Sequence, residues 1–307
     1  MNASVLVCTY NRAEMLAASL RSLAQLSVSP EFAWEVLIVD NNSRDNTRGV
    51  AEAFAAEFPG RFRYVFESRQ GKSFALNTAI QEAKGEILAF TDDDATVDQH
   101  WLAELIAAIE KFDCAGVGGK IVPVWDSTKP DWLILDGPYK LMDAVVSLDL
   151  GPEPIPIKTA AYGVNMAFRR EVFQKYGDFR KDLGPTVGSE VRGEDSEFCR
   201  RLVKAGETLV YVPGAVVYHP VEKKRMDKQY FQAWYLGRGR ASVREGGIPS
   251  DAVRYFGVPR YLLGSLGRNL LRWLLCPQAT PRFHHKLSLY ETWGQILESR
   301  TASLPTR

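Results

Sequence analysis

Short apolar runs alternate with longer amphipathic segments along the first 120 residues of the chain. β-Branched and aromatic residues dominate the short runs, which lie at 3–8, 34–39, 62–66, 86–91 and 115–121. In the segments between them, apolar residues recur at helical spacing, at 13–26, 45–58, 73–83 and 99–112. Strands that alternate with helices predict an α/β fold, Rossmann-like, with a mostly parallel sheet flanked by helices.

Polar clusters follow three of the predicted strands, at 9–12, 40–43 and 91–94. Right-handed crossovers bring the carboxyl ends of parallel strands to one edge of a sheet. We therefore expect these side chains to converge on one crevice and to form the functional site.

The rest of the chain has a less regular pattern. Residues 122–160 are rich in Pro, Asp and Trp and predict an irregular excursion, and a strand is predicted at 160–168. Three glycines make 184–193 a predicted mobile loop. The elements predicted next are a helix at 195–205 and two strands, at 208–212 and 215–218, which Pro213 and Gly214 separate.

Composition and charge bound the organisation of the chain. Its 307 residues, 46% hydrophobic and 24% charged, fit one large α/β domain with an appendage or two modest domains. Segment 221–307 holds 15 basic and 6 acidic residues, a net charge of +9, which leaves −8 for the remainder. The basic segment either binds an anionic partner, such as lipid, nucleic acid or a charged substrate, or docks on the acidic part of the chain.

The four cysteines and the hydropathy give expectations about the compartment. Cys8, Cys114, Cys199 and Cys276 form no Cys-x-x-Cys pair and have no His at zinc-finger spacing, so we expect reduced thiols in a cytosolic protein. No charged leader precedes the first strand, and no run of about 18 apolar residues occurs. We therefore expect neither a targeting segment nor a transmembrane helix.

Asp92, Asp93 and Asp94 follow a buried apolar strand and repel one another unless a cation compensates them. On extended backbone Asp92 and Asp94 point to the same side. Such a carboxylate pair suits Mg²⁺ or Mn²⁺, which can bridge diphosphate oxygens and stabilise a departing nucleotide diphosphate. The alternative is a solvated acidic turn that caps the helix starting near Asp98.

An ordered set of short motifs extends over about residues 4–220. The motifs are VCTYNR at 7–12, IVDNNS at 38–43 with Asp45 and Thr47, GK at 71–72 with ALN at 75–77, AKGE at 83–86 leading to Asp92–Asp94, GVNMAFRR at 163–170, GED at 193–195 with Glu197 and Phe198, and VYH at 217–219. Each motif alone is weak, but it is improbable that all of them occur by chance in this order and at compatible spacings. Through this set the chain resembles the family-2 glycosyltransferases of the GT-A fold.

The resemblance implies a nucleotide-sugar donor and a set of residues that bind it. Asp40 would accept a hydrogen bond from the base or ribose, which suits uracil or thymine; capping of the helix at 45–58 is the alternative. Arg69 and Lys72 would hold the diphosphate near a helix start, or are solvated surface cations. The implied donor-binding residues are Thr9, Tyr10, Arg12, Asp40, Arg69, Lys72, Asp92, Asp93, Gly163 and Asn165.

The resemblance also implies a metal site and a general base. Asp94 and Asp92 would ligate Mn²⁺ or Mg²⁺ together with His219, which is otherwise a structural histidine. Asp195 would act as the general base that deprotonates the acceptor hydroxyl, and Glu194 would orient Asp195 or contact the acceptor. Asp195 could also cap the helix that it begins, and the two roles are compatible. Loop 184–193 would close over the donor as a lid.

The basic C-terminal region departs from a minimal catalytic domain. Aromatic and basic residues mixed in this way are typical of a helix at an anionic membrane surface, although packing on the catalytic domain is the alternative. The segment contains no recognisable nucleic-acid-binding module. Within 258–275, Arg260, Arg268 and Arg272 share one helical face, and Leu262, Leu266, Leu270 and Leu274 share another.

Together these features predict an inverting, metal-dependent glycosyltransferase for polysaccharide or glycoconjugate assembly, with a UDP- or dTDP-sugar favoured as donor and a carbohydrate or glycolipid as acceptor. The predicted domains are a catalytic domain at 1–220, with a nucleotide half near 1–120 and an acceptor half near 121–220, and a helical region at 221–307. The predicted location is the cytoplasm, or peripherally the inner face of the plasma membrane. The alternatives are a nucleotidyltransferase, although residues 9–12 lack the glycines of a phosphate loop, and a non-catalytic sugar-nucleotide-binding protein.

Overall fold

The computed structural model describes residues 2–186, 188–189 and 191–301, which fold into two compact units. The sheet unit comprises Met1–Val124, Val146–Lys181 and Glu194–Pro220, and the helical unit comprises Trp125–Val145, Asp182–Gly193 and Val221–Arg307. The C-terminal region therefore groups with two earlier segments of the chain. The division of the chain at residue 220 into a catalytic domain and a C-terminal region stays a prediction.

Alternating strands and helices build the first part of the sheet unit, as the hydrophobic pattern predicts. Both ends of each of the four predicted helices lie within two residues of their predicted positions. The elements are β1 (Ala3–Thr9), α1 (Ala13–Ala24), β2 (Trp34–Asp40), α2 (Thr47–Glu57), β3 (Phe62–Phe66), α3 (Lys72–Glu82), β4 (Ile87–Asp92), β5 (Thr96–Val97), α4 (Trp101–Lys111) and β6 (Gly116–Trp125). Those that follow are β7 (Ile155–Pro156), β8 (Met166–Arg169), α6 (Arg170–Tyr176), α7 (Glu194–Lys204) and β9 (Leu209–Val221).

Among the described residues, nine strands form one mixed sheet in the order β3-β2-β1-β4-β8-β6-β9-β5, with β7 paired to β9 outside this path. Strands β1 to β4 run parallel, whereas β8 is antiparallel to both β4 and β6. Strands β1, β2 and β4 are almost completely buried, as expected for a sheet that helices cover on both faces, whereas the edge strand β3 is mostly half-buried.

The chain winds in two directions from β1, with β2 and β3 on one side and β4 on the other. Right-handed crossovers then put α1 and α2, which pack together, on one face of the sheet and α3 on the other. The winding direction reverses between β1 and β4. A ligand crevice is therefore expected outside the carboxyl ends of these two strands.

Two predicted elements differ from the structure. The apolar run 160–168 contributes only Met166–Arg169 to a strand, because the chain before it turns and the Asn165 N–H donates to the Tyr162 carbonyl. The two strands expected at 208–212 and 215–218 form one continuous strand, β9, so the predicted break was wrong. A proline is compatible with a strand where the ladder does not require its missing N–H.

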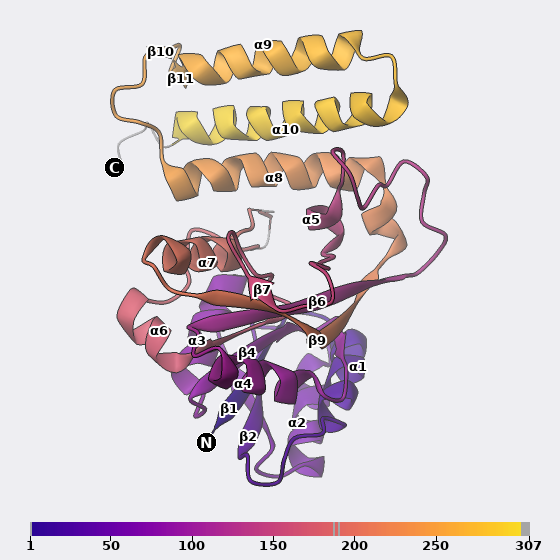
Figure 1. Cartoon of the computed structure of the whole chain (residues 1–307), viewed down its shortest axis with the longest axis vertical. Helices are drawn as coiled ribbons and strands as arrows, with labels where there is room; N and C mark the ends of the chain where they lie inside the picture. The colour runs from indigo at the N-terminus through magenta and orange to yellow at the C-terminus, as the bar shows by residue number, and fades with distance from the viewer. Residues whose placement is uncertain (1, 187, 190, 302–307) are drawn as a thin grey trace. The chain divides into compact units, whose positions relative to one another are not determined.

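Three long helices of the helical unit lie side by side, with α10 between α8 and α9 (Figure 1). A Cβ atom on Gly239 would lie 1.9 Å from the Glu291 carbonyl oxygen, so glycine permits the close approach of α8 and α10. No helix of the described ranges is long and apolar enough to cross a bilayer. The elements of this unit are α5 (Met142–Val145), the 3₁₀ helix η1 (Lys223–Met226), α8 (Lys228–Gly246), β10 (Arg254–Tyr255), β11 (Val258–Pro259), α9 (Arg260–Leu275) and α10 (Ala279–Thr301).

Candidate active site

The three polar clusters meet at one edge of the sheet, because the strand register aligns the strands that precede them. Thr9 pairs with Asp40 across β1 and β2, and Cys8 pairs with Asp92 across β1 and β4. Thr9 is buried, and Tyr10 follows it with a partly exposed side chain. These clusters therefore line the crevice that the winding of the sheet leaves open.

The aspartates at the end of β4 are paired with two cations. Arg12 Nη1 lies 2.9 Å from Asp93 Oδ1 and 2.8 Å from Asp94 Oδ2. Lys72 Nζ lies 2.8 Å from Asp92 Oδ1. Arg12 and Lys72 together thus contact all three carboxylates of the run, and α7 brings further carboxylates to the same place.

Lys72 connects the run of aspartates to α7, since its Nζ is also 3.9 Å from Glu194 Oε1. Burial, and then the charge of Asp195, raise the pKa of Glu194. Burial raises the pKa of Asp93 to about 6. The pKa of Asp92 lies below its usual range, because burial is outweighed by the charge of Lys72. Asp93 and Glu194 are therefore two buried acids with raised pKa values, and a cation bound beside them would favour their ionised forms.

Asp92, Asp94 and His219 have the geometry of a metal site. Each offers a ligand atom, and the three atoms lie within 4.8 Å of one another. His219 Nε2 is 3.7 Å from Asp94 Oδ1, and the imidazole is buried at the end of β9. The two carboxylates supply hard oxygen donors and the imidazole supplies a borderline nitrogen donor; this set fits Mn²⁺, and it fits Mg²⁺ less well because Mg²⁺ prefers oxygen ligands. The sheet thus brings His219 of β9 beside Asp92 and Asp94 at the end of β4, although they are far apart in the chain.

Asp195 lies in the first turn of α7 and is held by backbone groups. Its Oδ2 accepts a hydrogen bond of 2.7 Å from the Gly163 N–H. Its Oδ1 accepts from the Ser196 N–H at 2.6 Å and from the Ser196 hydroxyl at 3.2 Å. A Cβ on Gly163 would lie 3.1 Å from Asp195 Oδ2, so a larger residue there would press on the carboxylate. This arrangement orients a carboxylate that can act as a general base.

Both oxygens of Asp40 have partners within the protein. Oδ1 accepts from the Ser43 N–H at 2.9 Å, and Oδ2 accepts from the Tyr64 hydroxyl at 3.1 Å. Burial and the charge of Asp40 raise the pKa of Tyr64 to about 12, which keeps this phenol a donor. Each carboxylate oxygen can accept a second hydrogen bond, so Asp40 can still receive one from a ligand. Sequence reasoning missed Tyr64, which only the register of β2 and β3 places here.

The partner of the Arg69 guanidinium is Glu67. Its Nη2 is 2.6 Å from Glu67 Oε2 and its Nε is 2.9 Å from Glu67 Oε1, a two-point pair that Thr78 completes. Hydrogen bonds from Arg69 lower the pKa of Glu67 to about 2. The two cations expected to hold the diphosphate therefore have different partners: Lys72 contacts Asp92, whereas Arg69 pairs with Glu67 on the loop before α3.

Asn165 is expected from the resemblance to contact the donor or acceptor, but its side chain is fully buried. Its Oδ1 accepts from Trp101 Nε1, and its Nδ2 donates to the carbonyl oxygens of Lys120 and Ala215, each bond being 2.8 Å long. These contacts use the donors of the amide and give its oxygen a partner. We therefore assign Asn165 to the support of the site and do not retain the sugar contact.

The predicted lid at 184–193 belongs to the helical unit. Two of its residues, Val187 and Glu190, lie outside the described residues. The lid therefore stays a prediction.

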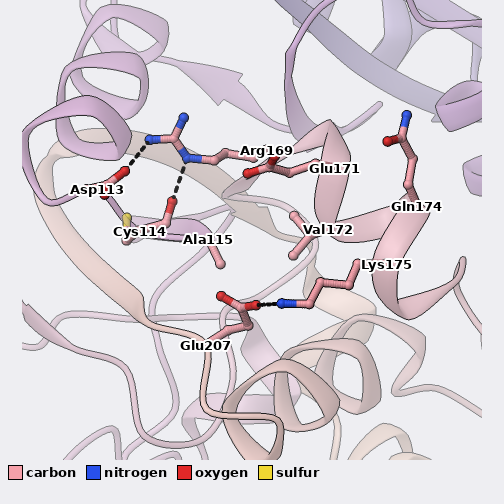
Figure 2. Close-up of a pocket in the computed structure, with 9 residues that line it drawn as sticks. All are labelled: Asp113, Cys114, Ala115, Arg169, Glu171, Val172, Gln174, Lys175 and Glu207. Carbon is pink, nitrogen blue, oxygen red and sulfur yellow. Dashed lines mark hydrogen bonds and ion pairs between the residues drawn. The ribbon is translucent and has the colours of Figure 1, made fainter.

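A separate cavity of about 540 Å³ opens at the edge of the sheet where β4 begins (Figure 2). Its charged side chains face one another: Arg169 lies 3.2 Å from Asp113, and Lys175 lies 2.9 Å from Glu207. Because Ile87 at the start of β4 pairs with Arg169, this cavity lies at the far end of the strand from Asp92. It is not part of the candidate active site.

Comparison with known proteins gives a consistent result. The family described as Glycosyl transferase family 2 matches residues 4–177. The succinoglycan biosynthesis protein ExoM of Rhizobium meliloti is 30% identical over 220 residues, which cover 71% of this chain and 67% of ExoM. The glucosyl-dolichyl phosphate glucuronosyltransferase of Haloferax volcanii is 26% identical over 244 residues, covering 77% of this chain and 75% of that protein.

A solved structure supports the fold. The mannosyltransferase PcManGT from Pyrobaculum calidifontis, in complex with GDP-Man and Mn²⁺, has a TM-score of 0.58 at 21% identity, covering 99% of this chain and 76% of that one. The predicted GT-A fold, with its C-terminal helical region, is thereby confirmed. Because the matched family spans more than half of the sequence and ExoM is similar over most of its own length, this chain belongs to glycosyl transferase family 2.

Proposed function

We propose that the chain is a metal-dependent, inverting glycosyltransferase that moves a sugar from a nucleotide diphosphate sugar to an acceptor hydroxyl. The observation that carries this proposal is the convergence of Asp92, Asp94 and His219 beside the oriented carboxylate of Asp195. The complex of PcManGT with GDP-Man and Mn²⁺ supports the choice of donor class and ion. Family membership removes the nucleotidyltransferase alternative.

Asp92, Asp94 and His219 would hold Mn²⁺ or Mg²⁺. When bound, such an ion acts as a Lewis acid that stabilises the negative charge of a departing diphosphate. Arg12 and Lys72 supply the other positive charges of the site, and Lys72 stands at the start of α3, where backbone N–H groups also favour anions. These cations would therefore help the chain to bind the diphosphate.

The nucleoside would lie over the ends of β1 and β2. Thr9 and Tyr10 border this part of the crevice, and the buried Asp40 carboxylate, fixed by Ser43 and Tyr64, would accept a hydrogen bond from the base. The N–H of uracil or thymine is such a donor. This contact favours a UDP- or dTDP-sugar.

Asp195 would take the proton from the acceptor hydroxyl as that oxygen attacks C1 of the donor sugar. The new bond joins the acceptor oxygen to C1, and the bond from C1 to the diphosphate oxygen breaks with its electron pair. A single direct displacement of this kind inverts the anomeric centre. Glu194 shares Lys72 with Asp92, so it would position the catalytic groups relative to one another.

The relatives suggest the class of acceptor. ExoM is named for succinoglycan biosynthesis, and the H. volcanii protein is named for transfer to glucosyl-dolichyl phosphate. A carbohydrate or glycolipid acceptor in polysaccharide or glycoconjugate assembly fits both. The crevice between β1 and β4 would bring its hydroxyl to Asp195.

A thermal-unfolding panel of UDP-, dTDP- and GDP-sugars with Mn²⁺, Mg²⁺ or EDTA tests the proposal. A ligand that binds only the folded state stabilises it by about 2.7 kcal/mol at 100 times its Kd. We expect a metal-dependent rise in Tm with UDP- or dTDP-sugars that Asp94→Asn abolishes. The matched control is Asp113→Asn, which removes a carboxylate at the other edge of the sheet and should respond like the wild type.

A rise in Tm with nucleotide sugar that is equally large in EDTA, or equally large in the Asp94→Asn variant, would contradict the metal site. A response to GDP-sugars alone would contradict the preference for a UDP- or dTDP-sugar, although guanine N1–H could still donate to Asp40. Transfer from an α-linked donor should give a β-linked product by NMR, and a retained anomer would refute inversion.

A further inference from the structure

The outward face of α9 exposes a stripe of leucines. α9 packs on α10 through the buried Leu262 and a hydrogen bond of 3.1 Å from Asn269 Nδ2 to Thr292 Oγ1. The leucines of the opposite side are left in solvent, with exposed fractions from 37% to 76%. They are Leu263, Leu270, Leu271, Leu274 and Leu275.

The hairpin that leads into α9 extends this apolar surface. Its strands β10 and β11 are joined by a turn in which Phe256 is 98% exposed. Val253 and Tyr255 beside it are about half exposed or more, at 58% and 49%. This hairpin joins the start of α9 directly (Figure 1), so an exposed aromatic turn immediately precedes the helix that carries the leucine stripe.

Basic residues accompany the apolar region, and acidic residues are missing from it. The segment 252–290 contains no Asp or Glu. At 100° per residue, Arg268 and Arg272 of α9 lie along one flank of the leucine stripe. Both are exposed. The Arg and Lys residues of the segment are Arg254, Arg260, Arg268, Arg272, Arg282 and Lys286.

We propose that α9 and the β10–β11 hairpin form a docking surface for an anionic lipid bilayer, with the leucines and Phe256 in the interface and the arginines at the headgroups. A helix with a leucine face and an arginine flank, too short to span, has the composition of an interfacial helix. Arginine can bury its stem in the apolar layer while its guanidinium reaches a lipid phosphate.

Charge distinguishes this occupant from a second copy of the chain. A two-fold dimer through this face would place the cations of 252–290 against the same cations of the partner, with no carboxylate from the segment between them. An anionic bilayer supplies the opposite charge along the whole face. The proposal goes beyond glycosyl transfer, because docking on lipid requires neither donor nor metal.

Flotation of the full chain with lipid vesicles tests the proposal. We expect binding to vesicles of phosphatidylcholine and phosphatidylglycerol at low salt, and weak binding to phosphatidylcholine alone or at high salt. Arg268→Gln with Arg272→Gln should weaken binding about 30-fold, or about fivefold for each arginine. The matched control is Arg48→Gln with Lys111→Gln, which removes two exposed cations of the sheet unit and should bind like the wild type.

The leucines are tested by a triple variant, Leu271→Ser, Leu274→Ser and Leu275→Ser. Because these side chains are exposed, the variant should keep the wild-type Tm and lose the binding that survives at high salt. Leu150→Ser removes an exposed leucine of the sheet unit and serves as its control.

Three outcomes would overturn the proposal. The first is that the chain does not bind anionic vesicles at low salt. The second is that the control variants weaken vesicle binding as much as the test variants do. The third is that the chain forms an oligomer, which the triple leucine variant dissociates while its binding to vesicles stays unchanged. Transfer to a water-soluble acceptor, assayed on the same variants, should be unaffected. That assay distinguishes failure of lipid docking from failure of the proposed enzyme activity.

Discussion

Replacing Asp195 with asparagine separates a catalytic role from a structural one, because each oxygen of this carboxylate has an observed partner. Oδ2 accepts from the Gly163 N–H, and Oδ1 accepts from the N–H and hydroxyl of Ser196. An amide keeps one acceptor oxygen and presents NH₂ at the other position. In Asp195→Asn the NH₂ therefore faces one of the two backbone N–H donors, and that hydrogen bond is lost.

The two consequences have different magnitudes. Loss of a general base lowers kcat by about 10²- to 10⁴-fold, or about 3–5 kcal/mol of activation free energy. An unsatisfied N–H costs about 1–3 kcal/mol of folding free energy, and the partly exposed position of Asp195 favours the lower end because water can replace the lost acceptor. We therefore expect a nearly inactive protein with a modest loss of stability.

The assay is kcat at saturating donor, measured beside calorimetric titration of the nucleotide in the presence of Mn²⁺. Asp195→Asn should bind the nucleotide with nearly wild-type affinity, since Asp92, Asp94 and His219 are unchanged. The control is Ser196→Ala, which removes the hydroxyl contact to Oδ1 and keeps the carboxylate; its kcat should stay within about tenfold of the wild type.

A kcat within tenfold of the wild type for Asp195→Asn would refute the general-base assignment. So would a loss of nucleotide affinity in proportion to the loss of kcat, because Asp195 would then act in binding.

Two further predictions concern stability. Asn165→Ala leaves the Trp101 indole N–H and two carbonyl oxygens without their buried partner, so urea unfolding should show a loss of at least about 3 kcal/mol, and a loss below about 1 kcal/mol would contradict this account. In the helical unit, burial raises the pKa of Glu298, but Arg244 and Arg240 lower it below its ordinary value of 4.5. The stabilisation of the fold by ionised Glu298 is therefore fully present above pH 4.5 and is lost as the pH falls through the lower pKa that Glu298 has in the folded state. Glu298→Gln should be less stable by about 1–2 kcal/mol at pH 7, because Arg240 is partly exposed. The difference should shrink in acid, and a difference independent of pH would exclude the ionic explanation.

Sequence reasoning recovered the parts of the fold that local patterns determine. The apolar runs up to residue 121 predicted the parallel strands, and the polar residues after them predicted the edge at which Asp40 and Asp92 meet. It missed Tyr64, because its contact with Asp40 depends on how β3 lies beside β2. It also missed Glu67, whose partners Arg69 and Thr78 are brought to it by the loop between β3 and α3 and by α3 itself. It also assigned Asn165 to a ligand, since an asparagine motif looks the same whether its amide faces a crevice or the core.

The pairing of Arg12 with Asp94 and of Lys72 with Asp92 has a consequence for the order in which ligands assemble. Both carboxylates carry an internal counterion, so a bound divalent ion would share them with the guanidinium and the ammonium. A nucleotide diphosphate would offer these two cations an alternative partner and would thereby free the carboxylates. Under the proposed function, ion and nucleotide should therefore bind with positive heterotropic cooperativity, each raising the affinity for the other by the same factor.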